Sequence, residues 1–363
     1  QIKCRFFHRF TDLLHIFKAG ATFKCQAQAN EKFYRQKGKI IYLRFSTESL
    51  TVSINYPANM KNAIPAIILS LFFSTTSMAL HFVTSVDSPS KASLSKTDWV
   101  SDTTANAVKL RGKPSRNDSV CFRCYEGDFI IDSNLDARSI SFYEQAFVIA
   151  ENKKINSLRG GLTFVISSNP NHTNLLHLKR SEMNVNGSVF NSPTSGNKRI
   201  GMNRIRLEDS KFSASGTMDF TITSSIFEPT AGRSGVCVEL VGDSIFKLKG
   251  DLLVDSLLEE NKNLLFRISF EERGGKMPKM VVDRAVIGGV DLKVAINGDL
   301  KKGRYTILES TGKKPIEGTL RSVTLNDKPV QLDAPTALKD KTITISIGAA
   351  DNRTKNDIIV TVQ

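Results

Sequence analysis

Carboxylates are the side chains of this chain that come closest to a catalytic set. Two carboxylates across a glycosidic bond can hydrolyse it, and Asp and Glu oxygens also hold calcium. The candidates are Asp219, Glu228, Glu239, Asp243, Asp251 and Asp255. None forms an Asp-Asp pair or an acidic run on an alternating strand, and Asp243 and Asp251 follow Gly in turns, where Asp is common for backbone reasons. We therefore assign no catalytic residue.

Cysteine chemistry centres on Cys121 and Cys124, the only Cys-x-x-Cys of the chain. A redox-active pair sits at a helix N-terminus, whereas the neighbours here indicate a strand or a turn. A zinc site needs further ligands, and the only other Cys after residue 79 is Cys237. The interpretation is a structural disulfide between Cys121 and Cys124, or two buried thiols. Cys237 alternates with Val236 and Val238, so we expect it on the opposite face of its strand.

Histidine is scarce after residue 79, where only His81, His172 and His177 occur. A serine triad needs an oriented histidine, and no G-x-S-x-G elbow is present to receive one. His172 and His177 lie five residues apart with no acidic residue between them. We expect loop or surface histidines, and neither a metal nor a cofactor.

A secretory signal peptide occupies residues 60–79. Lys61 makes the start basic, residues 63–73 (AIPAIILSLFF) are apolar, and Ser77 and Ala79 are the small residues before a cut between Ala79 and Leu80. The apolar run is too short to span a membrane, which needs about 20 residues. The protein is therefore expected to be exported, and to meet a membrane only during export.

The segment before the signal, residues 1–59, holds ten Lys and Arg against three Asp and Glu. It reads either as a basic arm for membranes or nucleic acid, or as a disordered extension upstream of the true start. We interpret it as the extension, because an internal signal peptide has no simple use. Residues 80–363 hold 39 Lys and Arg and 33 Asp and Glu, without a long basic run. No nucleic-acid partner is expected.

Residues 121–363 are predicted to be all-β. Apolar and polar residues alternate in segments such as 236–240 and 245–248, and Gly, Asn, Asp and Ser fill the gaps. A turn of helix near residues 255–261 is the one exception. The expected inward residues include Val238, Leu240, Phe246, Leu248, Leu252 and Val254.

Many short strands fit a β-solenoid or a β-sandwich. The solenoid is favoured because polar spacers suit its corners and a strand-turn-strand unit recurs loosely. The only Trp, Trp99, falls in residues 80–120, a Ser- and Thr-rich stretch read as a polar leader or N-terminal cap, so a Trp-centred sandwich core is not expected.

The C-terminal part carries a family resemblance. Residues 303–308 (GRYTIL), 316–318 (IEG) and 356–360 (NDIIV) form the succession G-x-Y-x-I/L-L, I-x-G and N-D-I/L-x-V. Over residues 242–363 the chain resembles the end of autotransporter-like passenger domains and of secreted proteins with autotransporter-associated β-strand repeats. The resemblance implies a right-handed parallel β-helix with a C-terminal cap from about residue 264. It also implies export by a bacterium, to the periplasm, the cell surface or beyond.

Two functions follow from this reading. The first is a non-enzymatic surface or secreted solenoid in adhesion, envelope or matrix, with a polysaccharide or cell-surface ligand as its partner. The alternative is a carbohydrate-active enzyme, a polysaccharide lyase or a glycoside hydrolase. An enzyme should gather acidic and basic side chains from successive repeats into one groove, with perturbed carboxylates. A structural solenoid should have dispersed charge, polar ladders and a capped end.

The first prediction concerns processing. Because Ala79 ends the signal pattern, we expect the exported protein to begin at Leu80, as N-terminal sequencing or intact mass will measure. Peptides from residues 1–59 in the exported product would contradict this prediction.

Overall fold

The structure is a computed structural model. It describes residues 31–36, 39–45, 50–55, 81–84, 91–97, 99–101, 109–110, 112–123, 127–143, 145–166, 172–193, 201–220, 235–254, 265–297, 300–312, 314–348 and 357–363. The signal peptide of residues 60–79, the cut between Ala79 and Leu80, and the helical turn near 255–261 lie outside these residues. The chain divides into two compact units, Gln1–Ser74 and Thr75–Gln363.

The first unit contains a three-stranded antiparallel sheet. Its strands are β1 (Glu31–Gln36), β2 (Lys39–Phe45) and β3 (Leu50–Asn55), in the order β1-β2-β3. Whether residues 1–59 belong to the exported protein stays a prediction.

The second unit is all-β: its described residues form strands and turns without a helix, in three ten-stranded sheets. Sheet 1 contains β4 (His81–Thr84), β6 (Trp99–Val100), β7 (Lys109–Leu110), β8 (Ser119–Phe122), β11 (Ser139–Tyr143), β14 (Leu162–Ile166), β17 (Val189–Pro193), β20 (Met218–Asp219), β23 (Leu252–Leu253) and β26 (Ala285–Val286). Sheet 2 contains β5 (Lys91–Ser93), β9 (Asp128–Ile131), β12 (Phe147–Glu151), β15 (Thr173–Lys179), β18 (Met202–Glu208), β21 (Gly235–Val241), β24 (Leu265–Glu271), β27 (Asp291–Ala295), β29 (Ser322–Leu325) and β30 (Lys328–Pro329). Sheet 3 contains β10 (Leu135–Ala137), β13 (Lys154–Ser157), β16 (Glu182–Val185), β19 (Lys211–Ala214), β22 (Ile245–Leu248), β25 (Lys279–Val282), β28 (Gly303–Ser310), β31 (Thr336–Leu338), β32 (Lys341–Gly348) and β33 (Asp357–Val362).

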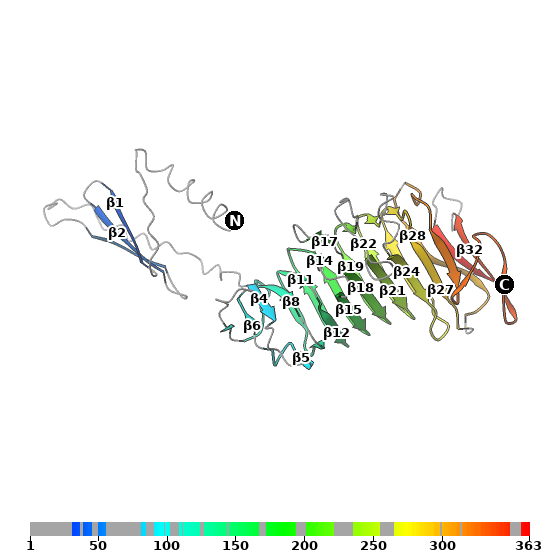
Figure 1. Cartoon of the computed structure of the whole chain (residues 1–363), viewed down its shortest axis with the longest axis horizontal. Helices are drawn as coiled ribbons and strands as arrows, with labels where there is room; N and C mark the ends of the chain where they lie inside the picture. The colour runs from blue at the N-terminus through cyan, green and yellow to red at the C-terminus, as the bar shows by residue number, and fades with distance from the viewer. Residues whose placement is uncertain are drawn as a thin grey trace. The chain divides into compact units, whose positions relative to one another are not determined.

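From β8 to β28 the chain visits sheets 1, 2 and 3 in turn, and each strand pairs in parallel with the strand three places later. Figure 1 shows these three-strand repeats stacked in chain order from β8 to β28. The large, mostly parallel sheets are compatible with a β-solenoid. The prediction of an all-β domain over residues 121–363 is confirmed for the described residues.

The core lies between the three sheets. Alternation along each strand turns one face inward, and all six residues predicted to point inward are buried. Side chains of neighbouring repeats also stack on one another inside it. The rings of Phe212 and Phe246 lie 4.7 Å apart and almost parallel, and those of Phe142 and Phe164 lie 4.8 Å apart.

At the N-terminal end, Trp99 is a core residue within the stretch that is read from the sequence as a polar leader or an N-terminal cap. It is 1% exposed, and its ring lies 6.3 Å from Phe122 and 5.9 Å from Phe129. The physical reason is the pairing of β6, which runs antiparallel to β4 at the edge of sheet 1 and puts the indole on the end of the core. The polar composition around Trp99 concealed a core residue.

At the C-terminal end, sheet 3 turns antiparallel. β33 pairs with β28 and β32, and β31 pairs with β32, all antiparallel. Ile307 is fully buried, and Tyr305 and Ile316 pack against the core from partly buried positions. Antiparallel strands at an end of stacked parallel repeats cover apolar surface that the last repeat would otherwise expose.

The corners differ in length. Only Asp209 and Ser210 separate β18 from β19, whereas residues 220–234 separate β20 from β21. The tight corners between sheets 2 and 3 place a residue with positive φ directly after the strand. These residues are Asn152 (54°), Arg180 (45°), Asp209 (47°) and Gly242 (66°). Equivalent corners keep the strands of sheets 2 and 3 in register, while the connections from sheet 1 to sheet 2 vary.

The second prediction tests the stacked core. Phe246→Ala removes a fully buried ring that stacks on Phe212, so we expect a loss of about 3–5 kcal/mol in the free energy of unfolding. The neighbour Ile245 is 38% exposed, and Ile245→Ala should cost less than about 1 kcal/mol. Denaturant unfolding of both variants checks the prediction. Equal losses would contradict the assignment of Phe246 to the core face.

Candidate functional site

The candidate site is the outer face of sheet 2, where charged side chains of successive repeats fall into rows. Strand pairing aligns His177 of β15 with Arg206 of β18, and Arg206 with Glu239 of β21. Each of the three lies between two buried aliphatic residues of its own strand, so each points outward. Neighbouring strands are about 4.8 Å apart, which brings these side chains within contact distance.

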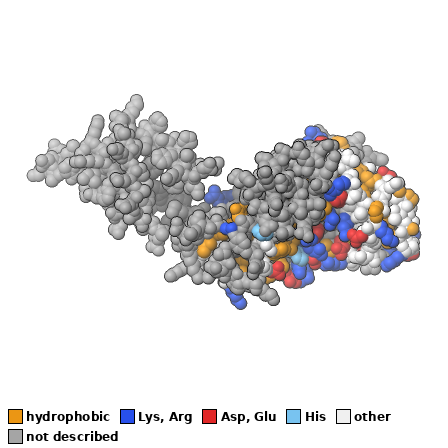
Figure 2. All heavy atoms as spheres, in the orientation of Figure 1, with side chains coloured by type: hydrophobic (Ala, Val, Ile, Leu, Met, Phe, Trp, Pro, Cys, Tyr) orange, Lys and Arg blue, Asp and Glu red, His pale blue; other side chains and the backbone are white. Residues whose placement is uncertain are grey.

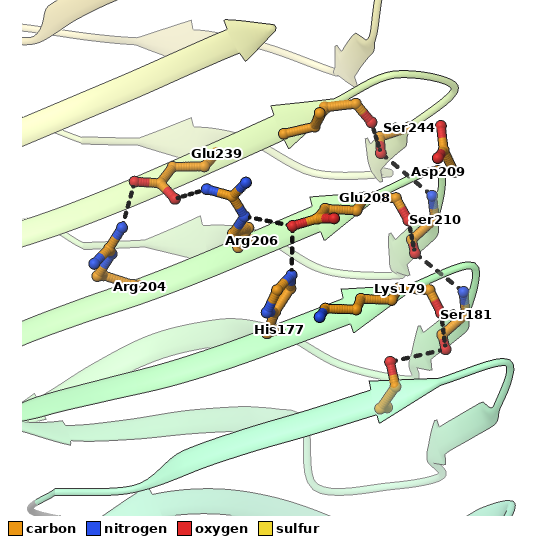
Figure 3. Close-up of polar contacts among 12 residues, drawn as sticks. His177, Lys179, Ser181, Arg204, Arg206, Glu208, Asp209, Ser210, Glu239 and Ser244 are labelled. Carbon is orange, nitrogen blue, oxygen red and sulfur yellow. Dashed lines mark hydrogen bonds and ion pairs between the residues drawn. The ribbon is translucent and has the colours of Figure 1, made fainter. Parts of the chain in front are cut away.

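A continuous chain of hydrogen bonds and ion pairs, shown in Figure 3, joins five residues: His177, Glu208, Arg206, Glu239 and Arg204. His177 Nε2 lies 2.8 Å from Glu208 Oε1, which also accepts a hydrogen bond from Arg206 Nε at 2.8 Å. Arg206 reaches Glu239 Oε2 at 3.3 Å, and Glu239 Oε1 accepts from Arg204 at 2.7 Å. Both carboxylates are thus shared between partners.

Glu208 is the most strongly perturbed carboxylate in the part of the chain that the structure describes. Burial raises its pKa, but the hydrogen bonds from Arg206 and His177 outweigh burial and lower the pKa to about 2. A second arginine, Arg273, lies 3.4 Å from the other oxygen of Glu208. Glu208 is therefore ionised at every physiological pH, and it cannot serve as a general acid.

His177 is a neutral ring at pH 7. Burial lowers its pKa below the ordinary 6.5, and this effect exceeds the opposite effect of Glu208. A neutral ring beside an ionised carboxylate donates its Nε2–H to that carboxylate. The charge of the row therefore comes from its arginines and glutamates.

A second row runs beside the first. It aligns Leu175, Arg204, Cys237, Arg267 and Asp291 on five neighbouring strands. Asp291 is bound by Arg321 at 2.5 Å and by the Ser322 hydroxyl at 2.7 Å. Burial raises the pKa of Asp291, but these hydrogen bonds and the charge of Arg267 bring it below its usual value.

Cys237 lies in the middle of the second row. As predicted, it points away from the buried Val236 and Val238, yet it is itself 3% exposed. Its Sγ lies 3.7 Å from the sulfur of Met202, and burial raises its pKa to about 11. A neutral thiol of this kind is a small apolar group and a poor nucleophile.

A serine ladder fixes the strand ends beside these rows. The backbone N–H of Ser181 donates to Ser210 Oγ at 3.0 Å, and that of Ser210 donates to Ser244 Oγ at 3.2 Å. Each hydroxyl donates in turn to the carbonyl of the strand end just before it, those of Lys179, Glu208 and Val241. Figure 3 shows the ladder where β15, β18 and β21 end. These bonds hold the charged rows at fixed spacing.

The acidic residues considered from the sequence do not form one site. Glu239 pairs with two arginines, Asp243 pairs with Lys276 at 2.6 Å, and Asp251 pairs with Arg284 at 2.7 Å. Asp219 is exposed on sheet 1, and Glu228 and Asp255 lie outside the described residues. Within the described ranges, no three His, Cys, Asp or Glu side chains are arranged to hold a metal ion.

The cysteine and histidine predictions have mixed outcomes. Cys121 is buried in β8, while Cys124 lies outside the described residues, so their disulfide stays a prediction. His81 is in β4 and His172 immediately precedes β15. His177 was taken as one of the loop or surface histidines, but it is a strand residue paired with Glu208, and its side chain is 13% exposed.

Sequence reasoning missed Arg206 and Glu208 altogether. A signal for Arg206 exists in three short stretches: Leu176-His177-Leu178, Ile205-Arg206-Leu207 and Val238-Glu239-Leu240. Each places one polar residue between two aliphatic residues at the same point of its repeat. The unequal connections between repeats hid this correspondence.

The described part of the chain contains no helix long and apolar enough to cross a membrane. Comparison with protein families, with curated proteins and with solved structures found no match for this chain.

The third prediction concerns the ionised Glu208. Unfolded Glu208 takes up a proton near pH 4.5, whereas the folded carboxylate stays ionised to about 2, so its contribution is present above pH 4.5 and is lost as the pH falls toward 2. We expect Glu208→Gln to lower the free energy of unfolding by roughly 2–3 kcal/mol near neutral pH, and by much less near pH 2.

The control is Glu151→Gln, which removes an exposed carboxylate that pairs with Arg180 and should cost less than about 1 kcal/mol. Denaturant unfolding measures the free energy of unfolding of the original chain and of both variants, near neutral pH and near pH 2. If Glu208→Gln lowers the free energy of unfolding equally at both pH values, the low pKa of Glu208 is contradicted.

Proposed function

We propose that the three sheets are the faces of a right-handed parallel β-helix. The regular passage of the chain through sheets 1, 2 and 3 supports this architecture, as does the parallel pairing with the strand three places later. β-sandwiches are built from two sheets of antiparallel strands, which makes the sandwich the weaker alternative. The resemblance of residues 242–363 to autotransporter-like passenger domains agrees with the same fold.

We propose that the protein is an exported, non-enzymatic solenoid that works in adhesion, envelope or matrix by binding a polysaccharide or a cell-surface ligand. The observation that carries this proposal is the use of polar side chains in bonds between repeats. The serine ladder, the ion pairs of sheet 2 and a second ladder on sheet 3 all join one repeat to the next. In the sheet 3 ladder Asn156 donates to Asp136 at 2.6 Å, Asn184 donates to Asn156 at 3.1 Å, and Ser213 donates to Asn184 at 2.7 Å.

One observation favours the alternative, a carbohydrate-active enzyme. His177, Arg206 and Glu239 come from three successive repeats, and Glu208 beside them has a strongly shifted pKa. A glycosidase acid, however, has a raised pKa, and the shift at Glu208 is downward. The histidine donates to Glu208, and the arginines are held by carboxylates, which is the arrangement of a rigid ion-pair lattice. We therefore rank the enzyme second.

The fourth prediction separates the two functions. The full chain is incubated with neutral and acidic polysaccharides, and new reducing ends and unsaturated uronate ends are measured. We expect no product above the buffer control, because no carboxylate of the charged rows is free to act as acid or base. Product formation that Glu208→Gln or His177→Gln abolishes would contradict the proposed function and establish the enzyme.

A further inference from the structure

Two arginines flank one small residue on the outer face of sheet 2. Cys237 of β21 is aligned with Arg204 of β18 on one side and with Arg267 of β24 on the other. The two arginine-bearing strands are two strand spacings apart, or about 9.6 Å. Because the Cys237 thiol is neutral and buried, it contributes no charge between the two guanidinium groups. The pair is therefore a cationic position with a neutral residue at its centre.

The arginine pair is incompletely neutralised. One nitrogen of Arg204 binds Glu239 at 2.7 Å, but its Nε is buried and has no hydrogen-bond partner. Glu239 is also shared with Arg206. Among the described residues, Arg267 forms neither a hydrogen bond nor an ion pair, and the nearby Asp291 is bound by Arg321. A buried donor without a partner is costly. The Arg204 side chain as a whole is 39% exposed, so a ligand can contact it.

The surroundings of the pair suit a chain-like ligand. Along the same row, Leu175 and Phe147 follow Arg204 toward the N-terminal end, and both are partly exposed. In the other direction Asp291 follows Arg267. Figure 2 shows acidic and basic side chains intermixed on the described part of the face toward the viewer. Acidic groups among the cations disfavour a densely charged polymer, whereas a polymer with spaced charges and apolar ring faces fits.

We propose that Arg204 and Arg267 together bind a carboxylate or sulfate group of an acidic polysaccharide that lies along this row. Guanidinium groups recognise such groups through paired, charge-assisted hydrogen bonds, and each arginine has N–H groups free of protein partners. The apolar faces of the adjoining sugar rings contact Leu175 and Phe147. This inference deepens the proposed function, on which it rests, by naming the ligand chemistry and the residues that read it.

The test measures binding of the full chain to hyaluronate and κ-carrageenan, which carry one acid group per disaccharide, and to neutral dextran, by affinity electrophoresis at physiological salt. Binding to either acidic polymer, with at least tenfold weaker binding to dextran, is expected. A hydrogen bond to a charged group contributes roughly 1.5–3 kcal/mol, so Arg267→Gln and Arg204→Gln should each weaken binding about 10- to 100-fold. The matched controls are Lys211→Gln and Lys247→Gln, which remove exposed cations from sheet 3 and should change binding less than twofold.

Thermal melting accompanies each variant. Arg267→Gln should melt like the original chain, because Arg267 has no ion pair among the described residues to lose. If Arg204→Gln lowers the melting temperature, the binding measurement on Arg267→Gln alone tests the inference. Absence of binding to both acidic polymers, equal binding to dextran, or equal losses in the lysine controls would each overturn the inference. Failure of the proposed function would instead appear as cleavage of a polysaccharide. None of these binding results includes cleavage, so the two failures can be distinguished.

Discussion

Parallel pairing between each strand and the strand three places later is the constraint on which the rest of the structure depends. It aligns equivalent residues of successive repeats at about 4.8 Å, both inside and outside the sheets. Inside, the alignment stacks Phe212 on Phe246. Outside, it lines up His177, Arg206 and Glu239. The short corners between sheets 2 and 3 maintain the register, because a left-handed residue and a serine ladder satisfy the backbone there.

The same register explains why the charged side chains on the outer face of sheet 2 are held in fixed positions and are not arranged for proton transfer. Side chains in a row meet neighbours from the repeats before and after, so opposite charges find partners along the stack. Glu208 accepts from His177, Arg206 and Arg273. Glu239 accepts from Arg204 and Arg206, so both carboxylates are held in place. A rigid, prearranged row binds an extended ligand with little loss of conformational freedom, whereas proton transfer needs a carboxyl group with a raised pKa. For this reason we propose recognition rather than catalysis for this face.

Sequence reasoning reached the strands and the core more easily than the site. Val238, Leu240 and Phe246 were assigned inward because period-two alternation is local and survives any change in loop length. The charged rows depend on register between repeats, and the intervals from His177 to Arg206 and from Arg206 to Glu239 differ because the connections from sheet 1 to sheet 2 differ. The burial of Trp99 could not be predicted for another reason: burial at the end of a stack depends on an antiparallel strand that local composition does not reveal.

The measurement that tests the stacked register most directly is the distance between spin labels along one row of sheet 2. Ile149, Ser269, Lys293 and Thr324 are partly exposed members of that row. Three label pairs share Ile149 and place the second label at Ser269, Lys293 or Thr324. These pairs span four, five and six strand spacings in that order, so the backbone separations should be about 19, 24 and 29 Å. Equal increments of one strand spacing are the predicted result. Distances that do not rise steadily from pair to pair would contradict the stack and the rows built on it.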